Sequence, residues 1–522
     1  MVRDSEWLAW IIPLVYVLGA IVALRRRHAW PALALAARAA LALATCGLLL
    51  DIGIDLRHAS TAVSLIAPVV TLLVAFLGWI IADYSRTSLA REPGERRYVV
   101  ALLATLASVT VVLTTENLLV LIAAWAASSV TVHQLLIFYR DRPLARIAAR
   151  KKFLVSRIAE VCMLAASALL YHRWHTLDLD ALARLAGSCK FVPVSVDLAA
   201  ALIALAVLLK SAQLPVHGWL LEVMEAPTSV SALLHAGIVN LGGYVLIRLA
   251  PLITTSPPAQ AILVIVGSTT AVLAGLTTMT CPSIKTRLAW STCSQMGLMA
   301  AECGLGLYAL ALLHLLAHAL YKAHAFLSSG EAVRESQARR MLPPAQVGRQ
   351  GTGKLQPLIA APLMLLVVVG SEDLWYHVLR VPTISGVAAV ICAFGIATLL
   401  WESDSNAALY LRNLGAAVLA VQLYLGWHAA ILSGLGVASV RPLQPLAEWT
   451  GLCFLLLYLA QWGAGHRANS ASIRRLFTWA AAGYFLDEPL TRLVTRRPPR
   501  HGARAVHPRT THRLARQEGE AA

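Results

Sequence analysis

Two histidines and a lysine recur at regular spacing in an otherwise apolar segment. His314, His318 and Lys322 are four residues apart, which places them on one stripe of an α-helix about 12 Å long. Histidine titrates near neutral pH, so such a stripe predicts a ladder that passes protons. Paired histidines also bind zinc, but Leu315 stands where the HExxH motif has its glutamate. A structural polar seam is the other alternative, and we favour the proton relay.

A second polar set surrounds an interruption in an apolar run. Lys210 is followed by Pro215, His217 and Gly218. Proline removes a backbone donor, so we expect the helix to break there and its freed carbonyls to line a hydrated cavity. A lysine beside such a break can release its proton. Lys210 is therefore the candidate switchable site, and a lysine that merely extends toward the membrane surface is the alternative.

Other ionisable residues flank these two sets. A lone histidine such as His235 is more often a packed core residue than a functional one, and the neighbouring ladder shifts that balance. Arg157 and Glu160 are three residues apart and can pair within a helix, either as a structural ion pair or as an electrostatic switch. Glu225 lies in a short expected loop. It is the leading candidate for the carboxylate that pairs with Lys210, and Glu160 is the next.

The elements that must position these groups are membrane-spanning helices. Hydrophobic residues make up 58% of the 522 residues and charged ones 14%, against about 45–50% and about 25% in soluble domains. Apolar runs of roughly 17–25 residues can cross a hydrocarbon core, where every backbone polar group needs a partner within its segment. The chain is therefore expected to be an all-α polytopic membrane protein, which excludes a soluble enzyme. We expect about 13–15 helices, near 7–24, 30–50, 59–81, 97–114, 117–139, 153–171, 196–214, 228–250, 260–280, 290–304, 307–328, 356–370, 383–401, 407–432 and 449–463.

The net charge of +17 reflects basic residues between the apolar runs rather than a nucleic-acid surface. Short cytoplasmic loops are enriched in Lys and Arg, which predicts the N-terminus outside and the C-terminus inside. The arginine-rich tail from about Arg496 is expected to be disordered and to lie near anionic lipid headgroups. Most of the basic residues lie in 25–27, 82–97, 140–152, 281–289, 331–355 and the tail from 463.

Three stretches resemble a known family. Lys210–His235, Ile284–Gly297 and His314–Gly330 are similar to the signature of the large proton-translocating membrane subunits of complex I, of the NuoL kind, and of Mrp-type antiporters. The resemblance implies two inverted five-helix repeats with broken helices around a hydrophilic axis. It implies Lys210 as the central lysine and a relay of His235, Lys285, His314, His318 and Lys322, with Glu225, Glu160, Arg157 and His217 as supporting charges.

With this resemblance the chain divides into five segments. They are N-terminal transmembrane helices at 1–96, a first transporter repeat at 97–215, a second at 216–370, C-terminal transmembrane helices at 371–465 and a basic cytoplasmic tail at 466–522.

Other features resemble one branch of this superfamily, the DabB family of membrane subunits in bacterial two-part inorganic-carbon pumps. Complex I subunits read Gly-Trp-Glu in the fifth helix, whereas this chain reads Ala124-Trp125-Ala126, and Glu160 stands where aspartate is usual. The chain ends without the long lateral helix of NuoL. Its late Gly483–Arg492 segment also looks more like DabB.

The resemblance implies an ion-conducting subunit of the bacterial inner membrane with no covalent chemistry of its own. It would pass protons or another cation and drive a soluble, carbonic-anhydrase-like zinc partner, DabA. The residues indicate no metal site or cofactor in this chain, and its eight cysteines form no CxxC pair. A subunit of a respiratory NADH dehydrogenase or of a cation/proton antiporter is the alternative, and a membrane scaffold is a third interpretation.

Overall fold

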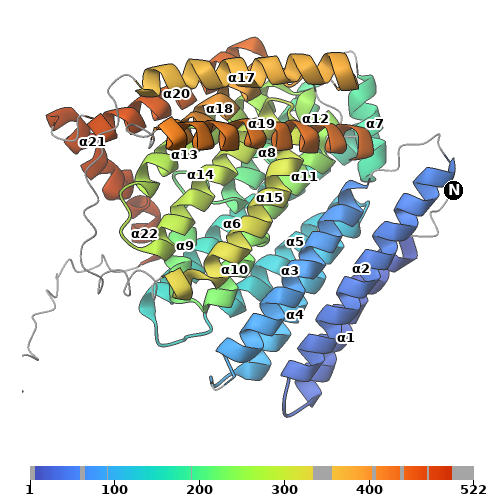
Figure 1. The fold of residues 1–522 in the computed structure, drawn as a ribbon. Coiled ribbons are helices and arrows are strands. Elements are labelled where there is room, and N and C mark those ends of the chain that lie inside the picture. The colour runs from blue at the N-terminus through green and yellow to red at the C-terminus, as the bar shows by residue number, and fades with distance from the viewer. Residues whose placement is uncertain are drawn as a thin grey trace, which may run out of the picture.

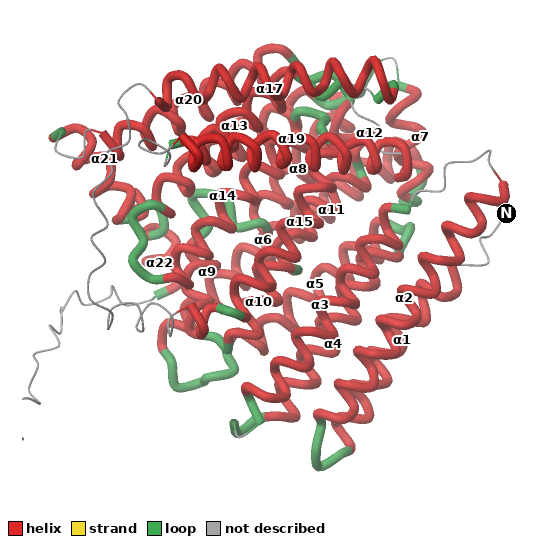
Figure 2. Tube along the Cα trace, viewed as in Figure 1, coloured by secondary structure: helices red, strands yellow, loops and turns green. Residues whose placement is uncertain are grey.

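The structure, a computed structural model, consists of helices and their connections (Figures 1 and 2). No strand occurs in the part of the chain that it describes. Ten of its helices are long and apolar enough to span a membrane, and two shorter apolar helices cover Trp10–Arg25 and Gly386–Leu400. The protein is a multi-pass membrane protein. The described residues are 6–58, 65–90, 92–189, 191–332, 356–381, 383–401, 407–435, 440–466 and 470–495.

The first half of the bundle is built from long helices that follow one another through short connections. Helices α1 and α2 form a hairpin at one edge (Figure 1). The helices of this half are α1 (Glu6–Arg25), α2 (Trp30–His58), α3 (Ile66–Ser88), α4 (Glu95–Thr114), α5 (Leu118–Leu136), α6 (Pro143–Trp174), α7 (Leu179–Ser188) and α8 (Val194–Lys210).

The second half begins with broken helices and ends with long ones. The interrupted elements are α9 (Gly218–Leu221), η1 (Glu222–Glu225), α10 (Thr228–Ala236), η2 (Ile238–Asn240), α11 (Leu241–Arg248) and α12 (Ala250–Thr254). The remaining elements are α13 (Pro257–Thr278), α14 (Ile284–Gly304), α15 (Tyr308–Leu327), α17 (Gln356–Leu379), α18 (Gly386–Ala397), η3 (Thr398–Leu400), α19 (Ala407–Leu435), α20 (Gln444–His466), α21 (Ala471–Ala481), η4 (Gly483–Phe485) and α22 (Glu488–Val494).

Helices occur at all fifteen expected positions, and the all-α fold class is confirmed. One boundary was wrong in a way that matters, because α6 begins at Pro143 rather than 153. Lys151 and Lys152, assigned to a basic loop, are buried residues of that helix. The backbone N–H of the first helical residue has no carbonyl partner within the helix. Proline lacks this N–H and is therefore a favourable first residue. The expected disordered tail from Arg496 lies outside the described residues.

The predicted helix break after Lys210 is confirmed. Helix α8 ends at Lys210, and regular helix resumes only at Gly218. A second interruption divides α10 from α11 at Gly237. The side-chain amide of Asn240 donates to the freed carbonyl of Ala236 at 2.8 Å, so this break carries its own hydrogen-bond partner.

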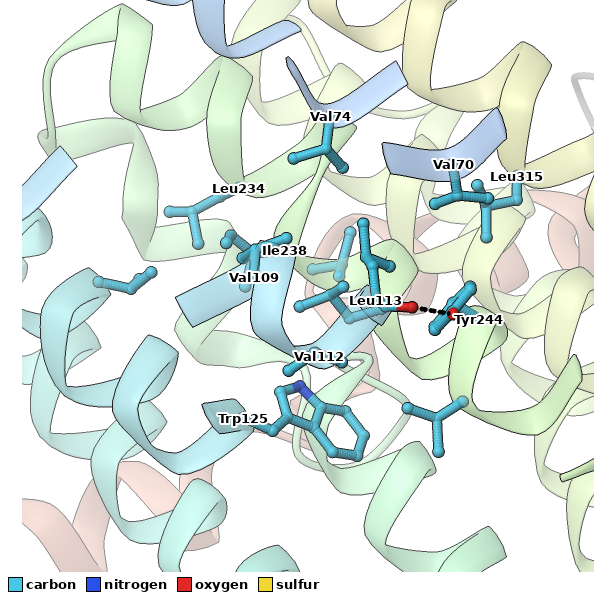
Figure 3. Close-up of a cluster of buried hydrophobic side chains, with 14 of the residues drawn as sticks. Val70, Val74, Val109, Val112, Leu113, Trp125, Leu234, Ile238, Tyr244 and Leu315 are labelled. Carbon is cyan, nitrogen blue, oxygen red and sulfur yellow. Dashed lines mark hydrogen bonds between the residues drawn. The ribbon is translucent and has the colours of Figure 1, made fainter. Parts of the chain in front are cut away.

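Two apolar clusters hold the bundle together. The larger runs through α1 to α15, and the smaller joins α17 to α20 with the ends of α13 to α15. Figure 3 shows part of the larger one, where Val70 of α3, Leu113 of α4 and Leu315 of α15 converge. Within it the Tyr244 hydroxyl donates to the Leu113 carbonyl at 2.7 Å. This cluster packs apolar side chains around the polar residues described below.

The crossing of α13 and α14 leads to a first prediction. A Cβ at Gly297 would lie 2.6 Å from the Gly267 carbonyl oxygen, so Gly297→Val must push the helices apart. Overpacking of this kind costs about 1–3 kcal/mol or more. We expect a clearly lower unfolding temperature for the purified variant in detergent. Gly415→Val in α19, where nothing lies within 4 Å, is the control and should unfold like the wild type.

Candidate functional site

The Lys210 ammonium lies at the end of α8 in a buried polar cluster. Its Nζ is 3.4 Å from Glu160 Oε1 and donates to the Trp125 carbonyl at 3.2 Å. The ammonium also lies 4.4 Å from the centre of the Trp125 ring, a favourable cation–π arrangement. Arg157 holds the same Glu160 oxygen at 2.8 Å. One carboxylate thus serves two cations from neighbouring helices.

Ser129 of α5 connects this cluster to a second buried lysine. Its hydroxyl oxygen lies 3.4 Å from Lys210 Nζ, and its backbone carbonyl accepts from Lys152 Nζ at 3.0 Å. Lys152 lies two turns before Glu160 on α6. Two lysines and one arginine therefore surround a single carboxylate. The positive charges in such a site destabilise one another, and a single carboxylate cannot balance all three.

The expectation that Glu225 pairs with Lys210 was wrong. Glu225 Oε2 lies 3.5 Å from Arg142 Nη1, which also donates to the Glu225 carbonyl at 2.8 Å. Both side chains are partly solvent-accessible, with exposed fractions of 48% for Arg142 and 36% for Glu225. Proximity in sequence misled here, because the irregular segment after Lys210 carries Glu225 toward the start of α6. Glu160, the second candidate, occupies the predicted role.

The predicted ladder of α15 is a buried stripe. His318 and Lys322 are both buried, and Lys322 Nζ donates to the Leu288 carbonyl at 3.1 Å. His235 of α10 joins them, since its ring stacks on Phe326 with centroids 4.4 Å apart. It lies close enough to Lys322 and His318 to interact electrostatically. Neither ring nitrogen of His235 or His318 has a protein partner among the described residues.

The ladder ends on a carboxylate that sequence reasoning did not identify. His314 Nδ1 lies 3.0 Å from Glu302 Oε2, and its ring centroid is 6.0 Å from that of His318. Glu302 is buried near the end of α14. Glu302 thus supplies a carboxylate oxygen at this end of the ladder. The available signal was a lone carboxylate at the end of an expected span.

Two predicted residues lie at the rims of the broken segment. Lys285 is half-buried, and its ammonium donates to the Thr228 hydroxyl at 2.9 Å. Thr228 begins α10, seven residues before His235. His217 is buried with its ring 4.8 Å from that of Trp290. The role of Lys285 and His217 in the relay is a proposal.

A third charged group, also missed, contains a lysine with no exposed side-chain surface. Lys151 Nζ lies 2.6 Å from Glu222 Oε1 and 2.6 Å from Asp487 Oδ2. Lys151 and Lys152 could have been found from their positions nine and eight residues before Glu160, which places them on neighbouring stripes of one helix. Asp487 had no such signal, since it is 336 residues away from Lys151.

Comparison with known proteins identifies the relatives of this chain. The family model described as "NADH:quinone oxidoreductase/Mrp antiporter, TM" matches residues 115–368, which contain the Lys210 cluster and the α15 ladder. A curated relative, "Probable inorganic carbon transporter subunit DabB" from Hydrogenovibrio crunogenus, is 37% identical over 93% of both chains. The DabB2 subunit of Halothiobacillus neapolitanus is 33% identical over 87% of this chain and 84% of its own.

A solved structure shares the fold. A chain of the Mrp complex from a Dietzia species superimposes with a TM-score of 0.59 at 24% identity. The match covers 92% of this chain and 59% of that one. The shared architecture is thus that of an Mrp-like membrane subunit.

The pairing at Lys210 makes a prediction that does not depend on function. Removing one partner of a buried ion pair costs about 3–5 kcal/mol, whereas an exposed pair contributes about 0–1 kcal/mol. Glu160→Ala should therefore lower the unfolding temperature in detergent much more than Glu225→Ala. Equal losses would show that Glu160 is not the carboxylate on which buried Lys210 depends.

Proposed function

Since the chain belongs to the DabB family of inorganic carbon transporter subunits, we propose that it is the ion-conducting membrane subunit of an energy-coupled inorganic carbon pump. The observation that carries this proposal is the match over 93% of both chains to a protein of that name. The buried titratable groups support it, because an ionisable residue inside a membrane is costly and marks an ion pathway by default.

The proposed path runs from the Lys210 cluster to the α15 ladder. Lys210 would alternate between a charged state paired with Glu160 and a neutral state favoured by Lys152. His235 would receive the proton and pass it along Lys322, His318 and His314 to Glu302. Histidine suits these steps because its nitrogens both donate and accept near neutral pH, and the unpartnered nitrogens of His235 and His318 can bind mobile water.

Cation flow would supply the energy, and a soluble partner would perform the carbon chemistry. One charge that crosses 100 mV releases about 2.3 kcal/mol, enough to bias CO2 hydration toward bicarbonate. We assign that hydration to a DabA-like zinc protein and no covalent step to this chain. The basic loops support an orientation with the N-terminus outside and the C-terminus inside a bacterial inner membrane.

The alternative is a subunit of a respiratory NADH dehydrogenase or cation antiporter, which would pass protons along the same residues. The extent of the sequence match counts against it, since the match covers 93% of the DabB relative but 46% of the NADH-quinone oxidoreductase subunit L of Mycobacterium tuberculosis. Co-purification separates the two. A zinc-binding soluble protein should accompany the full-length chain, and a set of respiratory or Mrp subunits would contradict the proposal.

The central lysine provides the most direct test. Lys210→Ala removes the group that binds and releases the proton, so we expect growth in low CO2 to be abolished and bicarbonate accumulation to fall to background. The variant should still reach the membrane and bind its partner. Near wild-type accumulation would contradict the assignment of Lys210.

The ladder is tested by comparing a variant that removes a titratable side chain with a variant that removes only packing. His318→Ala and Leu312→Ala each truncate a buried side chain of α15, but only the first removes a proton carrier. We expect bicarbonate uptake to fall much further in His318→Ala, because positioned proton transfer contributes about 10²–10⁴-fold. Equal losses at equal protein levels would mean that packing alone explains the stripe.

A further inference from the structure

The turn between α21 and α22 packs against helices α13 and α6 of the membrane domain. The Tyr484 hydroxyl donates to the Leu273 carbonyl of α13 at 3.1 Å. Three residues further, the Asp487 carboxylate contacts Lys151 of α6 at 2.6 Å. Segments far apart in the chain thus meet at this turn, and Figure 1 shows α22 close to α9.

The backbone of this turn is strained. Gly483, Tyr484 and Phe485 are consecutive left-handed residues with φ of 60°, 56° and 57°. Side-chain-bearing residues avoid this region because their Cβ crowds the following carbonyl. Such strain persists only where the surrounding contacts determine the conformation, and it gathers at functional sites. A flexible tail with no fixed position would have no reason to adopt this turn.

The charges at the turn do not balance. Lys151 is fully buried and contacts two carboxylates, Glu222 and Asp487. With all three ionised, one negative charge has no counter-charge within the triad. Glu222 Oε2 and Asp487 Oδ1 are buried and have no protein partner among the described residues. The triad therefore carries one unbalanced negative charge and has two carboxylate oxygens that can accept a proton.

The triad lies between a surface pocket and the Lys210 cluster. A pocket of about 710 Å³ is lined by His217, Trp290 and Asp487, among others. Asp487 retains 27% of its side-chain exposure. On the inner side, Lys151 is followed directly by Lys152, which shares Ser129 with Lys210. The triad thus lies between the pocket and the relay.

We propose that the turn at 483–487 is part of the proton path, with Asp487 as a positioning residue that holds Lys151 at the aqueous mouth of the Lys210 cluster. This inference rests on the proposed function. Asp487 and Glu222 place the Lys151 ammonium beside the pocket, so that a proton arriving from water meets an acceptor before it reaches Lys152. The C-terminal segment would then be a working component of the transporter.

Gly218 allows an independent test of the proposal. The first residue of α9 packs so closely on Asp487 that any Cβ at 218 would overlap its carboxylate. A carboxylate at the end of a side chain can rotate away, and in doing so it must leave Lys151. Gly218→Ala should therefore act as Asp487→Asn does, although the two residues belong to different segments.

The experiment measures bicarbonate uptake by cells that carry the full-length chain and its partner. Asp487→Asn, which keeps size but not charge, should lower uptake roughly tenfold or more, with normal membrane levels and partner binding. Asp487→Glu should restore much of it. Asp83→Asn is the matched control. Its carboxylate is exposed, lies outside the pocket and pairs with Arg86 at 3.2 Å, so uptake should stay normal.

A double variant separates a shared mechanism from two unrelated defects. Gly218→Ala with Asp487→Asn should transport no worse than either single variant. Losses that multiply, or wild-type uptake by Asp487→Asn, would overturn the proposal. If Asp487→Asn is not assembled, Gly218→Ala decides alone, and normal uptake by it overturns the proposal. Lys210→Ala is assayed in parallel, because normal uptake there contradicts the proposed function rather than the role of Asp487.

Discussion

A buried ammonium group needs oxygen ligands, and much of this molecule is arranged to supply them. Lys151, Lys152, Lys210 and Lys322 are all buried in a bundle whose outer surface is apolar. Taking a charge out of water costs several kcal/mol unless partners are already in place. Lys152 and Lys322 donate to backbone carbonyls, and the other two contact carboxylates.

The broken helices add further polar groups near these lysines. The carbonyls that accept from Lys152, Lys210 and Lys322 belong to the unbroken helices α5 and α14, so the interruption is not needed to supply them. The interruption after Lys210 instead contributes a buried histidine, His217, and an irregular backbone. It also brings Gly218 and Glu222 against α6 and the C-terminal turn. Lys151 thereby gains a carboxylate from η1, which lies within this irregular part of the chain.

The two ends of the proposed relay differ in character. The Lys210 cluster places two lysines and one arginine around Glu160. The α15 ladder ends at the Glu302 carboxylate, 3.0 Å from His314. Between them His235 and His318 are buried without protein hydrogen-bond partners among the described residues. The groups along the proposed path thus change from lysine to histidine to carboxylate. This order gives the path a direction that a row of identical groups would lack.

The amino-acid sequence by itself determined the features that depend on neighbours within a few turns. Apolar runs require helices in lipid, Pro215 follows the end of α8, and the spacing of His314, His318 and Lys322 puts them on one stripe. The same local reasoning correctly placed Arg157 beside Glu160. It also made Glu225 attractive for Lys210, because the two residues are close along the chain.

Only the tertiary structure decided which charges meet between helices. Helical periodicity specifies what lies three or four residues away, but it says nothing about which stripe a neighbouring helix presents. Packing brought Glu160 rather than Glu225 to Lys210, and Glu302 to His314. Packing likewise carried Asp487 to Lys151 across 336 residues. These pairs depend on the shape of the whole bundle, since each joins side chains on separate elements.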